Sequence, residues 1–239
     1  MIKRKIRKAL KHAFEPPAPL SRELFLKTLP QPRSSRRAFI LSQAGYIPLW
    51  VWGTSFATLL IAIFSACFIS RDTLGILSAC IPFVASSAVA ENSKSTVYKM
   101  AELERASLFS LKSVTLARLR IIGLSHVTLL CLLCPLASAG SLFPMLRTGI
   151  YLLVPYLLTT TLSLVFTRRF HGRETLYLCL GVAAMVSGLC IMAQTKFYVL
   201  YRQESFSRWI GALITLSAFT AWGYYKTIQK TEELSWSLS

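Results

Sequence analysis

Few residues of this 239-residue chain combine types and spacing that could carry out chemistry. Cys131-Leu-Leu-Cys134 has the spacing of a redox or metal motif, but it has no second CxxC and no nearby histidine at ligand spacing. All six cysteines fall inside apolar runs, which disulfide exchange and hydrated metal ions reach with difficulty. We therefore interpret them as small packing residues and expect neither a metal site nor a cofactor. They are Cys67, Cys80, Cys131, Cys134, Cys179 and Cys190.

His126 is the exception among long runs that otherwise contain almost no ionisable groups, and it lies about one turn into an apolar stretch at 121–139. Two roles are open for it. It could touch a substrate along a transport pathway, or it could form a hydrogen bond between helices, which is the commoner role of a histidine near the end of a span.

A charged segment from Glu91 to about Arg118 has the periodicity of a helix and is too long for a turn. Its apolar positions share one side, and its charged residues are left available to a soluble partner. A membrane-hugging connector is the alternative interpretation. The candidate partner-binding residues are Glu91, Glu102, Glu104 and Arg105.

Sequence motifs for enzymatic chemistry are missing. The chain has no Gly-x-x-x-x-Gly-Lys-Ser/Thr loop, so any ATP hydrolysis must occur in another subunit. It also has no His-Glu-x-x-His, no Gly-x-Ser-x-Gly and a single aspartate, Asp72. We therefore expect no enzyme.

The composition is that of an all-α integral membrane protein. The chain is 54% hydrophobic and 15% charged, and six apolar stretches are long enough to cross a hydrocarbon layer of about 30 Å as helices. The second stretch, with Pro82 and three serines, is the least certain. The six predicted spans are 47–69, 73–90, 121–139, 149–166, 175–192 and 209–225.

The distribution of lysine and arginine predicts the orientation. Of 27 basic residues, 22 lie before the first span, in the second and fourth links or in the tail, and five lie in the other links. Basic residues accumulate on the cytoplasmic side, so both termini are expected inside. The net charge of +17 is explained by the membrane, and no nucleic-acid partner is expected.

Residues 1–46 are expected to form a cytoplasmic basic segment. Residues 2–14 have the pattern of an amphipathic helix lying on an anionic lipid surface, and prolines end it. A short helix from Ser21 to about Leu29 and an amphipathic piece from Ser35 to about Gly45 follow. The transmembrane domain is expected at 47–226 and a cytoplasmic tail at 227–239.

In layout, the chain resembles the permease subunits of type 2 ABC exporters. The matching positions are Glu91 after the second span, Glu102-Leu-Glu-Arg105 in the following link, and Arg118 or Arg120 before the third span. The resemblance implies that the link forms a coupling helix docking on an ATPase and that residues 35–45 form an elbow helix. The outer link at 193–208 is shorter than in many members, which favours a small, peptide-related or uncharacterised branch.

The resemblance implies an exporter of a peptide, lipid-like or drug-like substrate in the bacterial inner membrane. An ABC ATPase subunit would drive it, and it would work as a homodimer or as a heterodimer with a second permease. The alternative is a non-transport membrane protein, such as a sensor, an immunity factor or an assembly scaffold, that binds a cytoplasmic partner through the same basic surface.

Overall fold

The computed structural model describes residues 42–68, 73–97, 111–139, 144–170, 174–196 and 205–236, which form helices and no β-strand. All of them belong to the second of two units, Arg37–Ser239; the first is Met1–Arg36. The long helices are α4 (Leu49–Phe68), α5 (Thr73–Val97), α7 (Leu111–Ala139), α8 (Met145–Arg169), α9 (Glu174–Lys196) and α10 (Phe206–Trp236).

Five of these helices, α4, α5, α7, α8 and α9, are long and apolar enough to cross a membrane. The membrane class predicted from composition is confirmed at this level. The predicted sixth span at 209–225 is helical and belongs to α10, but α10 does not reach the same mean hydropathy. Its tryptophans, tyrosines, threonines and glycines explain the difference, because hydropathy scales rate these residues far below leucine or isoleucine.

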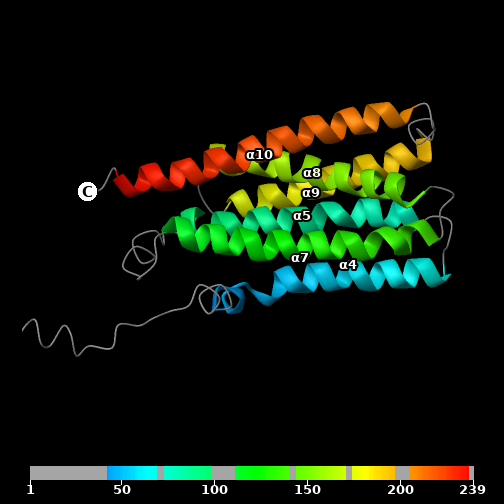
Figure 1. Ribbon diagram of the computed structural model, residues 1–239, viewed down its shortest axis with the longest axis horizontal. Helices are drawn as coiled ribbons and strands as arrows, with labels where there is room; N and C mark the ends of the chain where they lie inside the picture. Colours follow the sequence, from blue (N-terminus) through cyan, green and yellow to red (C-terminus); the bar gives the residue numbers. More distant parts are fainter. Residues whose placement is uncertain are drawn as a thin grey trace, which may run out of the picture. The chain divides into compact units, whose positions relative to one another are not determined.

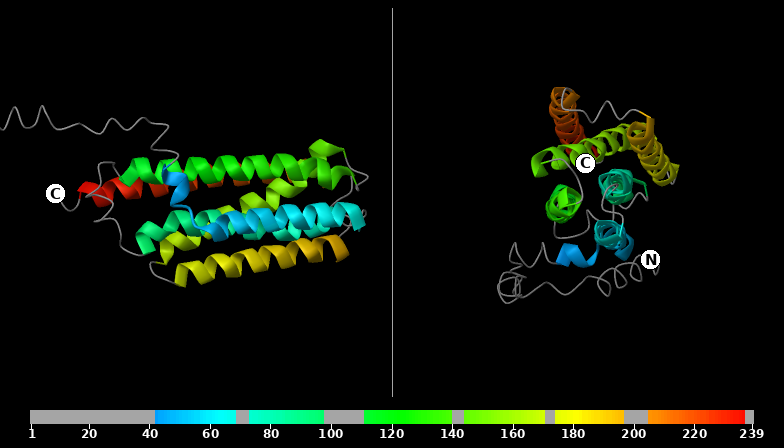
Figure 2. Two further views of the ribbon diagram at one scale, coloured as in Figure 1. Left: turned by 90° about the horizontal axis from the view of Figure 1, so that it is seen from below. Right: turned by 90° about the vertical axis from the view of Figure 1, so that its right-hand side faces the viewer.

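The six helices lie side by side, and successive helices run in opposite directions (Figure 1). The start of α4 and the end of α10 consequently lie at one end, as Figure 2 also shows. We call this the basic end, because it holds Arg118, Arg120, Arg168, Arg169 and Lys226. The opposite end holds Arg147, Lys196 and Arg208.

Helix α5 is the centre of the bundle and packs against α4, α7, α8 and α9. In its most apolar stretch 72% of the residues are buried, against 22% in α4 and 28% in α9. The segment whose crossing was least certain from sequence is therefore the one best shielded from lipid. Its hydroxyls bond to carbonyl oxygens one turn back: Ser78 to Gly75, Ser86 to Phe83 and Ser87 to Val84.

A cluster of branched and aromatic side chains fills the space between α4, α5, α7 and α8. Leu77, Leu133 and Leu152 are fully buried there, and Tyr151 is 1% exposed. The Tyr151 ring also meets Trp209 of α10 edge-on, with ring centroids 5.0 Å apart. This cluster fixes the rotation of α8, which contributes residues to the His126–Tyr156 pair and to the crevice described below.

Helix α10 is held to α8 by an arginine at each end of α8. Arg168 Nη2 donates to the Gly223 carbonyl oxygen and lies 3.3 Å from Thr227 Oγ1. The Arg168 guanidinium also lies 5.7 Å from the Trp222 ring centroid. At the opposite end, Arg147 lies 5.0 Å from the ring centroid of Phe206.

Several sequence predictions lie outside the described residues. They include the helices at 2–14 and 21–29, most of the elbow at 35–45, and the central part of the predicted coupling helix, 98–110. Of the elbow, Ser42–Gly45 is described and is helical. Helices α5 and α7 extend into the second link from both sides, to Val97 and from Leu111.

The neighbouring arginines of α8 provide a test of the α8–α10 contact. Arg168→Ala should lower the free energy of unfolding by about 2 kcal/mol, because the change leaves the Gly223 carbonyl and the Thr227 hydroxyl without their charged donor. Arg169→Ala removes the same charge from the adjacent, exposed position and should have little effect. SDS titration of the purified protein followed by circular dichroism measures both, and equal losses would contradict the contact.

Candidate functional site

His126 of α7 and Tyr156 of α8 form a buried polar pair. His126 Nδ1 lies 3.1 Å from the Tyr156 hydroxyl, and the two rings meet edge-on with centroids 5.9 Å apart. The His126 side chain is 1% exposed, and its Nε2 atom has no hydrogen-bond partner among the described residues. The observed bond is of the helix-packing kind, while contact with a substrate remains a prediction.

His126 pairs with a residue near the middle of α8. Its partner Tyr156 follows Arg147 by nine residues and precedes Arg168 by 12 on the same helix, which puts the pair near the middle of α8. An ionisable side chain at mid-depth is expensive unless it is neutral and bonded to a neighbour. The phenol supplies that bond here.

Glu91 lies in the last turns of α5 and is 4% exposed. Its level in the bundle follows from Ala88 and Ile122, which share one buried cluster across α5 and α7. Because these helices run in opposite directions, Glu91 lies at about the level of Arg118 on α7. A buried carboxylate needs compensation by donors or by positive charge, and the arginine at this level provides a source.

Glu91 is the one predicted partner-binding residue whose side chain the structure describes. Its side chain faces the interior of the bundle in the described structure, so it supports the α5–α7 packing at the basic end. Glu102, Glu104 and Arg105 lie outside the described residues, and their role in binding a partner remains a prediction.

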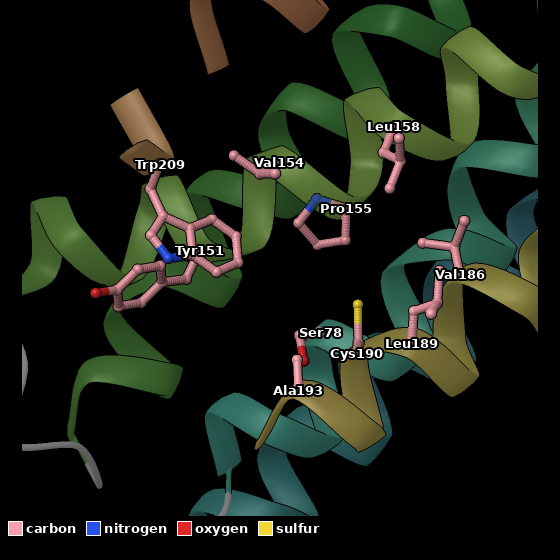
Figure 3. A pocket seen from close by; sticks show the side chains of 10 residues that line it. All are labelled: Ser78, Tyr151, Val154, Pro155, Leu158, Val186, Leu189, Cys190, Ala193 and Trp209. Atoms are coloured by element: carbon pink, nitrogen blue, oxygen red, sulfur yellow. The ribbon is translucent and has the colours of Figure 1, made fainter. Parts of the chain in front are cut away.

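A crevice of about 150 Å³ lies toward the opposite end of the bundle, between α8 and α9, with α5 beneath and α10 at one side (Figure 3). Its surface is almost entirely apolar, and Leu189, one of its residues, is 51% exposed. The crevice therefore opens on the outer surface of the helices. It is lined by Ser78, Tyr151, Val154, Pro155, Leu158, Val186, Leu189, Cys190, Ala193 and Trp209.

The floor of the crevice depends on a close approach of α9 to α5. Gln194 Nε2 donates to Ser78 Oγ over 3.2 Å. The Gln194 side chain occupies the space above Gly75, where an added Cβ atom would overlap it. These contacts hold the last turns of α9 against α5, while α10 packs on α8.

The cysteines differ in their surroundings. Cys179 is buried, Cys80, Cys134 and Cys190 are half-buried, and Cys67 and Cys131 are exposed. The interpretation of all six as packing residues is therefore wrong for Cys67 and Cys131, which lie on the outer faces of α4 and α7. A thiol on such a face is tolerated because it behaves as a small apolar group.

Sequence reasoning missed two of these features. The crevice is built from residues of four helices, and positions so far apart in the chain give no joint signal in the sequence. The contact of Arg168 with α10 had no signal, because a basic residue at the inner end of a span is expected on charge distribution alone.

Comparisons of the chain with protein-family models, with curated proteins and with solved structures find no match.

The His126–Tyr156 bond can be measured by a double-mutant cycle with His126→Phe, Tyr156→Phe and the double variant. We expect a coupling free energy of about 0.6 kcal/mol, because hydrogen bonds between membrane helices are worth about that much on average. SDS-induced unfolding of the four proteins measures it. A cycle between His126→Phe and Thr215→Val, which changes an exposed residue of α10, is the control and should give no coupling. Zero coupling in the first cycle would contradict the bond.

Proposed function

We propose that this chain is the membrane-embedded permease subunit of an ABC transporter, an exporter in the bacterial inner membrane driven by a separate ATPase. The observation that carries the proposal is the common end shared by the start of α4 and the end of α10 (Figure 1). With α10 crossing, the chain has six spans, and its basic links and tail all lie on one side. A peptide, lipid-like or drug-like substrate fits the apolar character of the bundle.

The length of the charge-free part of α10 supports its assignment as the sixth span. Arg208 and Lys226 enclose 17 uncharged residues. The helical rise between these two basic residues is about 27 Å, which suits a hydrocarbon layer of about 30 Å once the side chains extend outward. Trp209 and Trp222 lie just inside the two boundaries, where amphipathic rings are enriched.

The spacing of basic residues along α8 gives a similar membrane-spanning length. Arg147 and Arg168 are 21 residues apart, or about 31 Å along a helix. Both arginines contact α10, near its start and near the end of its uncharged stretch. Helices α8 and α10 are thus matched in the length that they present to lipid, which favours a crossing of α10 over a position on the membrane surface.

The helices on either side of the predicted ATPase-binding link, α5 and α7, support its assignment to the cytoplasmic side. Arg118 and Arg120 mark the inner boundary of α7, and the helix starts at Leu111, about 10 Å before Arg118. Helix α5 likewise continues to Val97, past its apolar stretch. Two helices that extend beyond the membrane would hold the segment containing Glu102, Glu104 and Arg105 on the cytoplasmic side, where a soluble partner can reach it.

The packed interior favours a second candidate, a non-transport scaffold or sensor. Among the described residues, the crevice is small and apolar, and the hydroxyls of α5 bond within their own helix. One copy therefore provides no polar pathway, and a permease would need a pathway between two copies or between this chain and a second permease. A scaffold would need none.

Topology reporters test the six-span arrangement. Reporters fused after Ser93, Arg169 and Lys230 should read as cytoplasmic, and those after Arg71, Ser141 and Gln203 as external, because 22 of 27 basic residues then remain inside. Alkaline phosphatase and fluorescent-protein fusions measure the two sides. An external reading at Lys230 would mean that α10 does not cross, and the exporter architecture would be wrong.

Charge reversal in the link tests the ATPase partner. Glu102→Lys with Glu104→Lys should abolish co-purification of an ATPase subunit and transport-coupled ATP hydrolysis, because repulsion replaces charge-assisted bonding. Membrane insertion should be unchanged, since neither residue lies in a span. The matched control is Glu232→Lys with Glu233→Lys in the tail, which should do little. Parental binding and activity in the link variant would favour the scaffold.

A further inference from the structure

Basic residues that lie on the side opposite to most of the positive charge gather around one place. Arg147 begins α8, Lys196 ends α9 and Arg208 begins α10. They are three of the five basic residues on this side of the chain. The acidic residues with described side chains, Glu91 and Glu174, lie at the basic end; Asp72 and Glu204 are outside the described residues.

Each of these three residues lies within one helical turn of a residue that lines the crevice. Arg147 precedes Tyr151 by four positions, Lys196 follows Ala193 by three, and Arg208 directly precedes Trp209. Arg147 also contacts the ring of Phe206, which brings it close to the start of α10. Along their helices these three residues lie one to four positions beyond residues of the lining, toward the end of the bundle opposite to the basic end, and we call Arg147, Lys196 and Arg208 the basic rim.

The crevice exists because α9 and α10 both pack on α8 and make little direct contact with each other. Its wall includes the exposed Leu189, so it opens sideways, toward lipid if these helices cross the membrane. An apolar space of about 150 Å³ has room for a small hydrocarbon group. A segment of an acyl chain has the required chemistry and enters directly from the bilayer.

We propose that this crevice is a binding site for an acidic phospholipid of the outer leaflet, with one acyl chain between α8 and α9 and the phosphate at the basic rim. The lining excludes a soluble polar ligand, and a free phosphate would leave the apolar part unused. The site rests on the crossing of α10 proposed above and is independent of any ATPase partner. Each basic residue near an anionic headgroup contributes favourable electrostatic energy to lipid binding. The rim provides three such residues.

Trp209 lines the crevice and reports directly on its occupant. A full-length protein with Trp50, Trp52, Trp222 and Trp236 changed to Phe retains this single tryptophan. In phosphatidylcholine nanodiscs that contain a few per cent of phosphatidylglycerol brominated on its acyl chains, Trp209 fluorescence should be strongly quenched. The same fraction of brominated phosphatidylcholine should quench it several-fold less. Equal quenching by the two lipids would overturn the proposal.

Rim variants test the phosphate site. Lys196→Gln, which changes an exposed residue at the end of α9, should reduce the preference for phosphatidylglycerol about fivefold, since one basic residue near an anionic headgroup is worth about a factor of this size. Arg208→Gln should act in the same direction. Quenching by brominated phosphatidylcholine should stay at the parental value in both. An unchanged preference in Lys196→Gln would overturn the assignment of the rim.

Filling the crevice tests the acyl-chain site. Ala193→Phe places a ring in the crevice and should reduce quenching of Trp209 by both lipids, whereas Ala184→Phe changes an exposed alanine of the same helix and should not. Circular dichroism and gel filtration check that both variants fold. Equal quenching in the two folded variants would contradict the site. If the reporter at Lys230 reads as external, α10 does not cross the membrane, and the proposed function fails together with the premise of this site. If only ATPase binding is absent, the lipid result is not affected.

Discussion

Hydrocarbon offers no hydrogen-bond partner to a hydroxyl, an amide or a guanidinium group, and the polar side chains of the bundle must meet this constraint. Helix α5, with Ser78, Ser86 and Ser87, takes the centre, where neighbouring helices cover its hydroxyls. Helix α4 has a nearly continuous run of apolar residues and takes the periphery.

Arginine side chains also need hydrogen-bond partners that hydrocarbon does not offer, and they find them at the ends of the helices. A guanidinium group at a helix end can reach the interface, and its aliphatic stem can pack along a neighbour. Arg168 uses its donors on a carbonyl and a hydroxyl of α10, and Arg147 lies on an aromatic ring of the same helix. The charges that position α8 in the membrane therefore also fasten α10, which explains how a helix of modest hydropathy is retained in the bundle.

The helical class, the approximate positions of the helices and the direction of the charge asymmetry could be predicted from sequence, because they depend on runs of residues and on counts. The burial of α5 could not, since hydropathy describes what a segment contains and not which face meets a neighbour. The His126–Tyr156 bond joins positions 30 residues apart and depends on the rotation of α7 against α8. The burial of Glu91 near the end of α5 was likewise not visible in the sequence, and its predicted part in binding a partner remains a prediction.

The crevice shows how packing can leave a specific site in a protein that carries little recognisable chemistry. Gln194 of α9 lies against Gly75 of α5, where a larger residue would meet its amide, and it donates to Ser78 Oγ. Tyr151 and Trp209 hold α10 on the other side of α8. The space between is bounded by apolar atoms, and bringing polar groups into it would cost desolvation without a partner. Arg147, Lys196 and Arg208 lie beyond it toward the helix ends, where basic side chains can reach water and headgroups if these helices cross the membrane. The same helix packing therefore produces both an apolar crevice for an acyl chain and a group of basic residues for an anionic headgroup.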